Sequence, residues 1–164
     1  MTAQQLISCL RLKYLEGEGG YFTRIYLGSK RTDSQRRIGS SILYLATYES
    51  FSSLHRLAED EIWHYCMGDP AQQLLLNPDG SGEMRLFGSD ITSGQMPASV
   101  VSGGTWQAVR PMLKGQWTLF GVTMPLAYEQ HEFERGNAEH LKHQYPEYRH
   151  HIERMAEGEV NEFP

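Results

Sequence analysis

Cysteine is scarce in this sequence, with two residues among 164. Cys9 and Cys66 stand far apart and neither belongs to a closely spaced pair, which argues against a disulfide framework and a cysteine-based metal site. No run of apolar residues has the length of a membrane span. The N-terminal sequence MTAQQLISCLRLKYL lacks the basic start and uninterrupted apolar stretch of a signal peptide. These absences predict a cytoplasmic protein with no membrane partner.

Positive charge is also in short supply. Lysine and arginine number 15 against 20 aspartates and glutamates, so the formal net charge is −5. Because a protein must neutralise phosphates with a basic surface to bind nucleic acid, this balance predicts no nucleic-acid partner. Hydrophobic residues make up 40% of the chain and charged residues only 21%, which argues against disorder. We predict a single domain over residues 1–164.

Short β-like segments separated by turn residues dominate the middle of the chain. The predicted strands are Tyr21–Leu27, Ser41–Thr47, Ile62–Met67, Gln73–Leu76, Glu83–Phe87, Thr105–Val109 and Trp117–Thr123. Closely spaced strands without helices between them are typical of a sandwich or barrel. The sequence therefore predicts an all-β fold.

Helical patterns are confined to the two ends. From Thr2 to about Lys13, apolar residues recur at helical spacing, and Thr2 with Gln5 forms a capping box. The glycine-rich run EGEGG then ends this helix. In the tail, residues 137–164, we predict helices at Ala138–Tyr145 and Glu147–Ala156, separated by a proline.

The segment HRLAEDEIWHYCMG places His55, Leu57, Glu61 and Gly68 at the offsets of the first cupin motif, His-x-His, three or four residues, Glu, six residues, Gly. With GEGGYFTRIY upstream and VVSGGTWQAV downstream, the chain resembles the cupin superfamily, in particular the cupin-5 or DUF985 branch. The resemblance implies a double-stranded β-helix, also called a jelly-roll barrel, over about residues 15–136, with short flanking helices.

The same motifs argue against a metal cofactor. Metal-binding cupins use two His and one Glu from the first motif and one His from the second. Here Leu57 stands in the second His slot, Trp106 in the His slot of the second motif, and Arg110 in its Asn slot. The remaining pair is too small for a stable zinc or non-haem iron site, so we expect no metal and no other cofactor.

Five residues form the predicted ligand site. The resemblance places His55, Glu61 and Trp106 at the centre of the barrel. The two-residue period of a strand adds Tyr65 after Glu61 and Arg110 after Trp106. We predict that these five side chains converge on one cavity for a small polar, possibly anionic or sugar-like, molecule. The alternative is structural: a hydrogen-bonded His–Glu pair, a tryptophan that fills the barrel and an arginine at its rim.

Two further hypotheses concern the reaction and the partner. Catalytic residues are not assigned, but a metal-independent isomerase or epimerase of the sugar-nucleotide type could use His55 and Glu61 as acid–base groups. On the strand that carries Glu61, alternation turns Ile62, His64 and Cys66 to the opposite face. Because that face is mostly apolar, we predict that a second copy covers it and that the protein is a homodimer.

Overall fold

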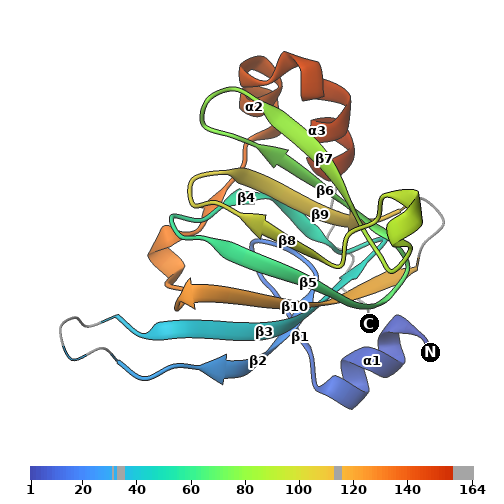
Figure 1. The fold of residues 1–164 in the computed structure, drawn as a ribbon, viewed down its shortest axis with the longest axis vertical. Helices are drawn as coiled ribbons and strands as arrows, with labels where there is room; N and C mark the ends of the chain where they lie inside the picture. Colours follow the sequence, from blue (N-terminus) through green and yellow to red (C-terminus); the bar gives the residue numbers. More distant parts are fainter. Residues whose placement is uncertain (31, 33–35, 113–115, 157–164) are drawn as a thin grey trace.

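Two antiparallel β-sheets face each other in the computed structural model, which describes residues 1–30, 32, 36–112 and 116–156 (Figure 1). One sheet has the strand order β1-β2-β3-β10-β5-β8 and the other the order β11-β4-β9-β6-β7. The strands are β1 (Lys13–Tyr14), β2 (Tyr21–Leu27), β3 (Ile38–Thr47), β4 (Ser52–Arg56), β5 (Glu61–Gly68), β6 (Ala71–Leu76), β7 (Gly82–Phe87), β8 (Ala98–Val101), β9 (Trp106–Pro111), β10 (Trp117–Leu126) and β11 (Glu134–Arg135). The all-β jelly-roll arrangement predicted from the sequence is confirmed.

The main hydrophobic core lies between the two sheets. Aromatic side chains dominate it: the rings of Trp63 and Phe120 lie 5.2 Å apart, and those of Phe87 and Phe120 lie 5.1 Å apart, in edge-to-face contact. Alternation along β5 turns Trp63 inward, where it is buried, and His64 outward, where it is exposed. Each strand therefore presents one set of side chains to the space between the sheets and another to its outer face.

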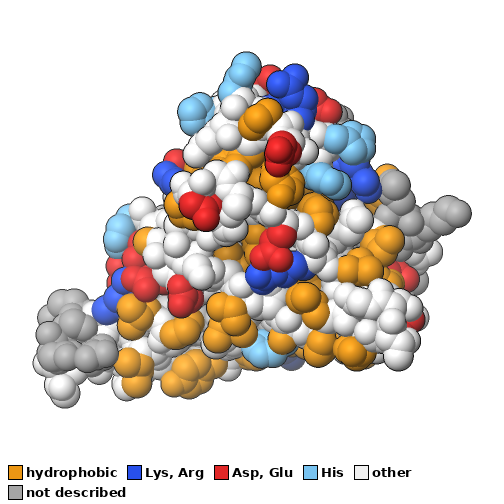
Figure 2. Space-filling view, turned by 45° about the horizontal axis from the view of Figure 1, so that its top comes forward, with side chains coloured by type: hydrophobic (Ala, Val, Ile, Leu, Met, Phe, Trp, Pro, Cys, Tyr) orange, Lys and Arg blue, Asp and Glu red, His pale blue; other side chains and the backbone are white. Residues whose placement is uncertain are grey.

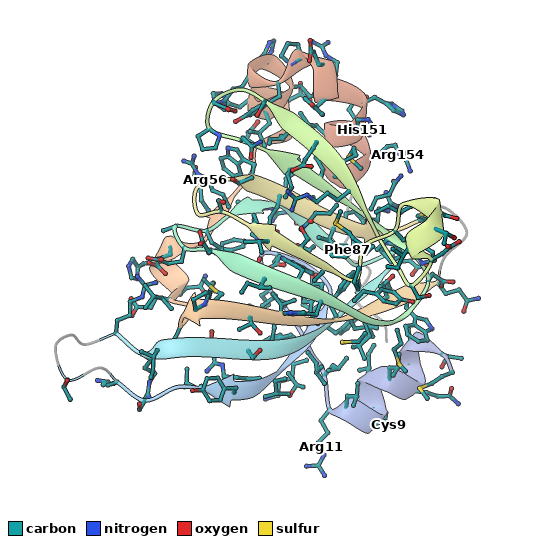
Figure 3. The ribbon with its side chains drawn as sticks, viewed as in Figure 1. Cys9, Arg11, Arg56, Phe87, His151 and Arg154 are labelled. Atoms are coloured by element: carbon teal, nitrogen blue, oxygen red, sulfur yellow. The ribbon has the colours of Figure 1, made fainter. Side chains whose placement is uncertain are left out.

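Short helices cover parts of the two outer faces (Figure 1). Helix α1 (Ala3–Leu10) packs against the six-stranded sheet, and the predicted capping box at Thr2 is present. Helices α2 (Ala138–Gln144) and α3 (Arg149–Ala156), joined by a 3₁₀ turn at Pro146–Tyr148, pack against the five-stranded sheet. Figure 3 shows His151 and Arg154 on α3, at the opposite end of the molecule from Cys9.

The C-terminal tail was predicted over residues 137–164. Its residues 157–164 lie outside the described part of the chain. Within the described part, no helix is long and apolar enough to cross a membrane.

The EGEGG run forms a turn that lies against β3 and β4. Gly19 has φ +101°, and a Cβ there would lie 2.3 Å from the carbonyl oxygen of Phe51. At Gly20, with φ +70°, a Cβ would lie 2.2 Å from the hydroxyl of Tyr44. Only glycine permits this backbone conformation and this close approach. The turn thereby brings Glu18 beside the space between the sheets.

Candidate functional site

A cavity of about 230 Å³ lies beside the inner faces of β2 and β3. Its wall comes from the N-terminal turn, from strands of the six-stranded sheet and from the segment that follows β10. The lining residues are Leu15, Glu16, Glu18, Phe22, Arg24, Ser40, Ile42, Leu57, Glu61, Val122, Met124, Tyr128, Gln130 and Phe133. Most of this wall is apolar, so its few polar groups determine what the cavity can hold.

Glu61 is the most deeply buried carboxyl group of the wall, with 8% of its surface exposed. Its Oε2 accepts hydrogen bonds from Trp63 Nε1 at 2.9 Å and from Gln107 Nε2 at 2.6 Å. In the described part of the chain, both donors bind the same oxygen, Oε2, so the other oxygen of Glu61, Oε1, is left for other contacts. Burial raises the pKa of Glu61, and the nearby charge of Glu18 acts in the same direction, whereas His55 and the two hydrogen bonds oppose the rise only in part.

His55 lies next to this carboxyl group and is buried. Its Nδ1 is 2.9 Å from the carbonyl oxygen of Ser53, and because a carbonyl only accepts, Nδ1 carries the proton. In the neutral ring Nε2 is then an acceptor, and it has no hydrogen-bond partner within the described structure. The imidazole stacks on Phe133, with ring centroids 5.5 Å apart and planes 19° apart. Since Phe133 lines the cavity, His55 lies directly behind that part of the wall.

The N-terminal turn supplies a second carboxylate. Glu18 accepts a hydrogen bond from Ser52 Oγ at 2.7 Å, and its backbone carbonyl accepts one from Ser53 Oγ at 2.6 Å. Both serines are buried at the start of β4. Their hydroxyl groups fix the turn on β4 and hold Glu18 at the cavity wall.

Residues 127–135 close another side of the cavity. Tyr128, Gln130 and Phe133 from this segment line the wall. Arg36 holds the segment in place, because it contacts Glu132 at 2.6 Å and Glu59, from the β4–β5 loop, at 2.9 Å. The segment ends in β11, which pairs with β4 next to His55. The cavity wall therefore depends on parts of the chain that are about a hundred positions apart.

Trp106 does not face the cavity, contrary to the prediction. Its neighbour Gln107 pairs with His55 across β4 and β9 and faces inward, so alternation turns Trp106 to the outer face of the five-stranded sheet. There it packs with the residues of α2 and α3, and the guanidinium of Arg56 lies 4.5 Å from the centre of its ring. The inward-facing residue of the second motif is Gln107.

Arg110 lies on the same outer face and is also absent from the cavity wall. Its guanidinium lies 4.5 Å from the ring centres of both Tyr48 and Phe51. Its Nη1 donates to the carbonyl oxygen of Arg154 near the C-terminus of α3, at 2.7 Å. A cation is favourable at that end of a helix, so Arg110 fastens α3 to the sheet rather than binding a ligand.

Tyr65 faces the interior, as predicted, but it too is absent from the cavity wall. Its hydroxyl donates to the carbonyl oxygen of Gly68 at 2.6 Å. Of the five predicted residues, only Glu61 lines the cavity, and His55 lies behind the wall, stacked on Phe133. The prediction missed Glu18, Arg24 and the residues of the 127–135 segment. The EGEGG run was the available signal for Glu18, and alternation in Tyr21–Leu27 was the signal for Arg24.

The residues at the cupin metal slots do not fit a metal ion. Of the first-motif positions, His55 and Glu61 offer ligand atoms and Leu57 offers none, although it lines the cavity. The described residues contain no group of three or more His, Cys, Asp or Glu side chains that could hold a metal ion. Gln107, the inward residue of the second motif, already donates its amide to Glu61. We therefore derive no chemistry through a metal at this site.

Comparison with solved structures supports the same fold. A protein from Shewanella oneidensis is 25% identical and superposes with a TM-score of 0.87, over 97% of this chain and 99% of its own. A hypothetical protein from Leishmania major is 27% identical, with a TM-score of 0.84, over 95% and 99%. An oxalate decarboxylase from Bacillus subtilis is 13% identical with a TM-score of 0.55, and the match covers 92% of this chain but 39% of that one. This last likeness concerns the fold alone.

A comparison of the sequence with models of protein families shows to which family the chain belongs. No curated protein matches the sequence. The model described as Cupin superfamily (DUF985) matches residues 4–135, which include the N-terminal turn, His55, Glu61 and the 127–135 segment. The chain therefore belongs to the DUF985 family of the cupin superfamily.

Proposed function

We propose that this protein binds a small polar molecule in the cavity, with His55 and Glu61 as its polar anchors. One observation carries the proposal: the buried Nε2 of His55 has no hydrogen-bond partner among the described residues, beside a cavity whose wall includes the buried carboxyl group of Glu61. Buried polar groups are almost always hydrogen-bonded, because an unpaired one costs about 1–3 kcal/mol. A ligand whose donor group reaches Nε2 of the neutral imidazole removes this cost.

The unpaired atoms also favour one kind of ligand. Glu61, which lines the cavity, offers only acceptor atoms when it is ionised, and the unpaired atoms behind the wall include Gln107 Oε1, an acceptor, and His55 Nε2, an acceptor in the neutral ring. A molecule that presents donors, such as the hydroxyl groups of a sugar or an ammonium group, matches them. The anionic ligand suggested by the sequence loses its main support, because Arg110 binds α3 instead.

Thermal unfolding with a panel of monosaccharides, small amines and small carboxylates tests the proposal. A compound at a hundred times its dissociation constant adds about 2.7 kcal/mol, which corresponds to roughly 5–10 °C in melting temperature for a domain of this size. We expect His55→Ala and Glu61→Gln to abolish this shift while the protein stays folded. Tyr65→Phe, on the same strand as Glu61 but outside the cavity wall, should leave the shift intact. If His55 and Glu61 had only a structural role, the same substitutions would lower the stability of the ligand-free protein and leave the affinity for the compound unchanged.

A second candidate function is metal-independent isomerisation by proton transfer. It is favoured by two neighbouring groups: the carboxyl group of Glu61, which lines the cavity and whose pKa burial raises, and the imidazole of His55 behind the wall. A carboxyl group and an imidazole are the groups that most often donate and accept protons in such reactions. Turnover of activated sugars, lost in Glu61→Gln, would favour this reaction over simple binding.

The burial of Glu61 also predicts how stability depends on pH. Because the pKa of Glu61 is raised above its ordinary value of 4.5, the folded protein keeps this proton to higher pH than the unfolded chain. The resulting stabilisation is complete below the unfolded pKa and is lost as the pH rises through the folded pKa. Glu61→Gln keeps an acceptor for Trp63 and Gln107, so it should gain stability relative to wild type as the pH rises. Denaturant titrations at several pH values measure this gain, and a pH-independent difference would contradict it.

A further inference from the structure

The charged groups of the cavity wall are mostly acidic. Glu16, Glu18 and Glu61 line the wall together with one cation, Arg24. Glu18 and Glu61 are close enough that the charge of the first raises the pKa of the second. An anion that entered this space would meet the same repulsion, whereas a cation would relieve it.

The apolar part of the wall suits a cation with a hydrocarbon body. Phe22 and Phe133 contribute aromatic surface, and Leu15, Ile42 and Met124 contribute aliphatic surface. Aromatic faces attract ammonium groups through their quadrupole, by about 0.5–1 kcal/mol at exposed sites and more where water is excluded. A sugar, whose faces carry hydroxyl groups, would leave several of them against aliphatic carbon.

We propose that the cavity binds a small organic amine, with its ammonium group beside the carboxylates of Glu18 and Glu61 and its apolar body along Phe22 and Phe133. This inference rests on the proposed binding function and names its ligand class. The ammonium group also offers three donors, which suit the carboxylate oxygens of Glu18 and Glu61 on the wall. Among the described residues that line the wall, Arg24 is the one Lys or Arg.

Amine binding should release a proton. In the free protein the buried carboxyl group of Glu61 holds a proton to higher pH than an exposed glutamate does. An ammonium group beside it favours the carboxylate, so the carboxyl proton leaves to solvent while the amine keeps its own three protons. Affinity for the amine should therefore rise with pH across the range in which free Glu61 titrates. A neutral ligand has no such coupling.

Three compounds with one ring and different polar groups test the charge preference: benzylamine, benzyl alcohol and benzoate. Isothermal titration calorimetry of the 164-residue protein at several pH values measures each affinity. We expect benzylamine to bind at least tenfold more tightly than benzyl alcohol, and benzoate to bind most weakly. Repeating the benzylamine titration in two buffers with different ionisation enthalpies measures the released proton.

Matched variants assign the effect to the two carboxylates. Glu61→Gln should bring the affinities for benzylamine and benzyl alcohol within about threefold of each other and abolish proton release, because the variant residue cannot ionise. Glu18→Gln should weaken benzylamine binding while leaving benzyl alcohol unchanged. Glu147→Gln, at an exposed carboxylate on the C-terminal helices, should change neither affinity.

Other results would overturn the inference. Benzoate or benzyl alcohol binding as tightly as benzylamine would do so, as would absence of benzylamine binding at millimolar concentration. If the monosaccharides or carboxylates of the wider panel still stabilise the protein through His55 and Glu61, the binding function stands and only the amine class fails. If no compound of any class does so, both fail.

Discussion

Replacing Trp106 with alanine should lower the free energy of unfolding by about 3–5 kcal/mol, the range measured when a large aromatic side chain is removed from a packed core. Trp106 is 6% exposed and packs between the five-stranded sheet and the C-terminal helices, where Leu141 and Tyr145 contact the same cluster. Truncation leaves a cavity there and weakens the attachment of α2. Equilibrium denaturation in urea or guanidinium chloride measures the loss.

The same variant distinguishes the outer position of Trp106 from the inward position that its motif slot suggests. We expect Trp106→Ala to bind a cavity ligand with unchanged affinity at a temperature where it remains folded, because Trp106 is absent from the wall. Trp106→Phe, which keeps most of the packing, serves as the milder control. Unchanged stability together with lost ligand affinity would show that the tryptophan lies inside the barrel after all.

We propose that a second copy covers the outer face of the six-stranded sheet, so a charge introduced on this face should convert the proposed dimer to a monomer. Eight positions on β3, β10, β5 and β8 lie side by side there by register and alternation: Ser41, Leu43, Gly121, Thr123, Ile62, His64, Val100 and Ala98. None of them is Asp, Glu, Lys or Arg, so two copies related by a two-fold axis would meet no like charges. Val100 is 54% exposed, and Figure 2 shows hydrophobic side chains along the lower rim of the molecule.

Ile62→Lys tests this proposal at the centre of the face. An unpaired lysine buried between two apolar surfaces costs several kcal/mol, and about 4 kcal/mol corresponds to roughly a thousandfold weaker association. Sedimentation velocity at micromolar concentration should find a wild-type dimer and a folded Ile62→Lys monomer. Glu83→Lys, at an exposed position on β7 of the other sheet, is the matched control and should remain dimeric. A monomeric wild-type protein under these conditions contradicts the proposal.

Whether a strand could be predicted from the sequence depended on how its residues are buried. The seven predicted strands are short apolar segments with turn residues between them, and all seven are present in the structure. Strand β4 was missed because its sequence, SSLHR, is mostly polar although four of its five residues are buried. Its serines are satisfied by Glu18, which lies 34 positions from Ser52. A hydrogen bond of that range leaves no periodic signal in a sequence.

The site was predicted only in part, for two physical reasons. A shift of one residue reverses the face of every side chain on a strand, so the motif slot assigned to Trp106 pointed outward and Gln107 pointed inward. Alternation also says which side chains share a face, but not which strands are neighbours. Glu61, Glu18 and Phe133 line the same cavity because the N-terminal turn and the 127–135 segment lie against the barrel beside Glu61. Glu61, which lines the cavity, and His55, which lies behind its wall, were singled out because both belong to one contiguous motif.

The hydrogen bond from Trp63 to Glu61 gives the protein an intrinsic optical probe. The indole N–H donates to Oε2 of the carboxyl group at 2.9 Å, deep in the core. Ionisation of Glu61, or a ligand that engages its other oxygen, changes the electric field at this indole and hence its ultraviolet emission. Trp117 donates to the backbone carbonyl of Met1 instead, and Trp106 lies on the far side of the five-stranded sheet. Fluorescence of Trp63 can therefore follow both the protonation and the filling of the cavity without an added dye.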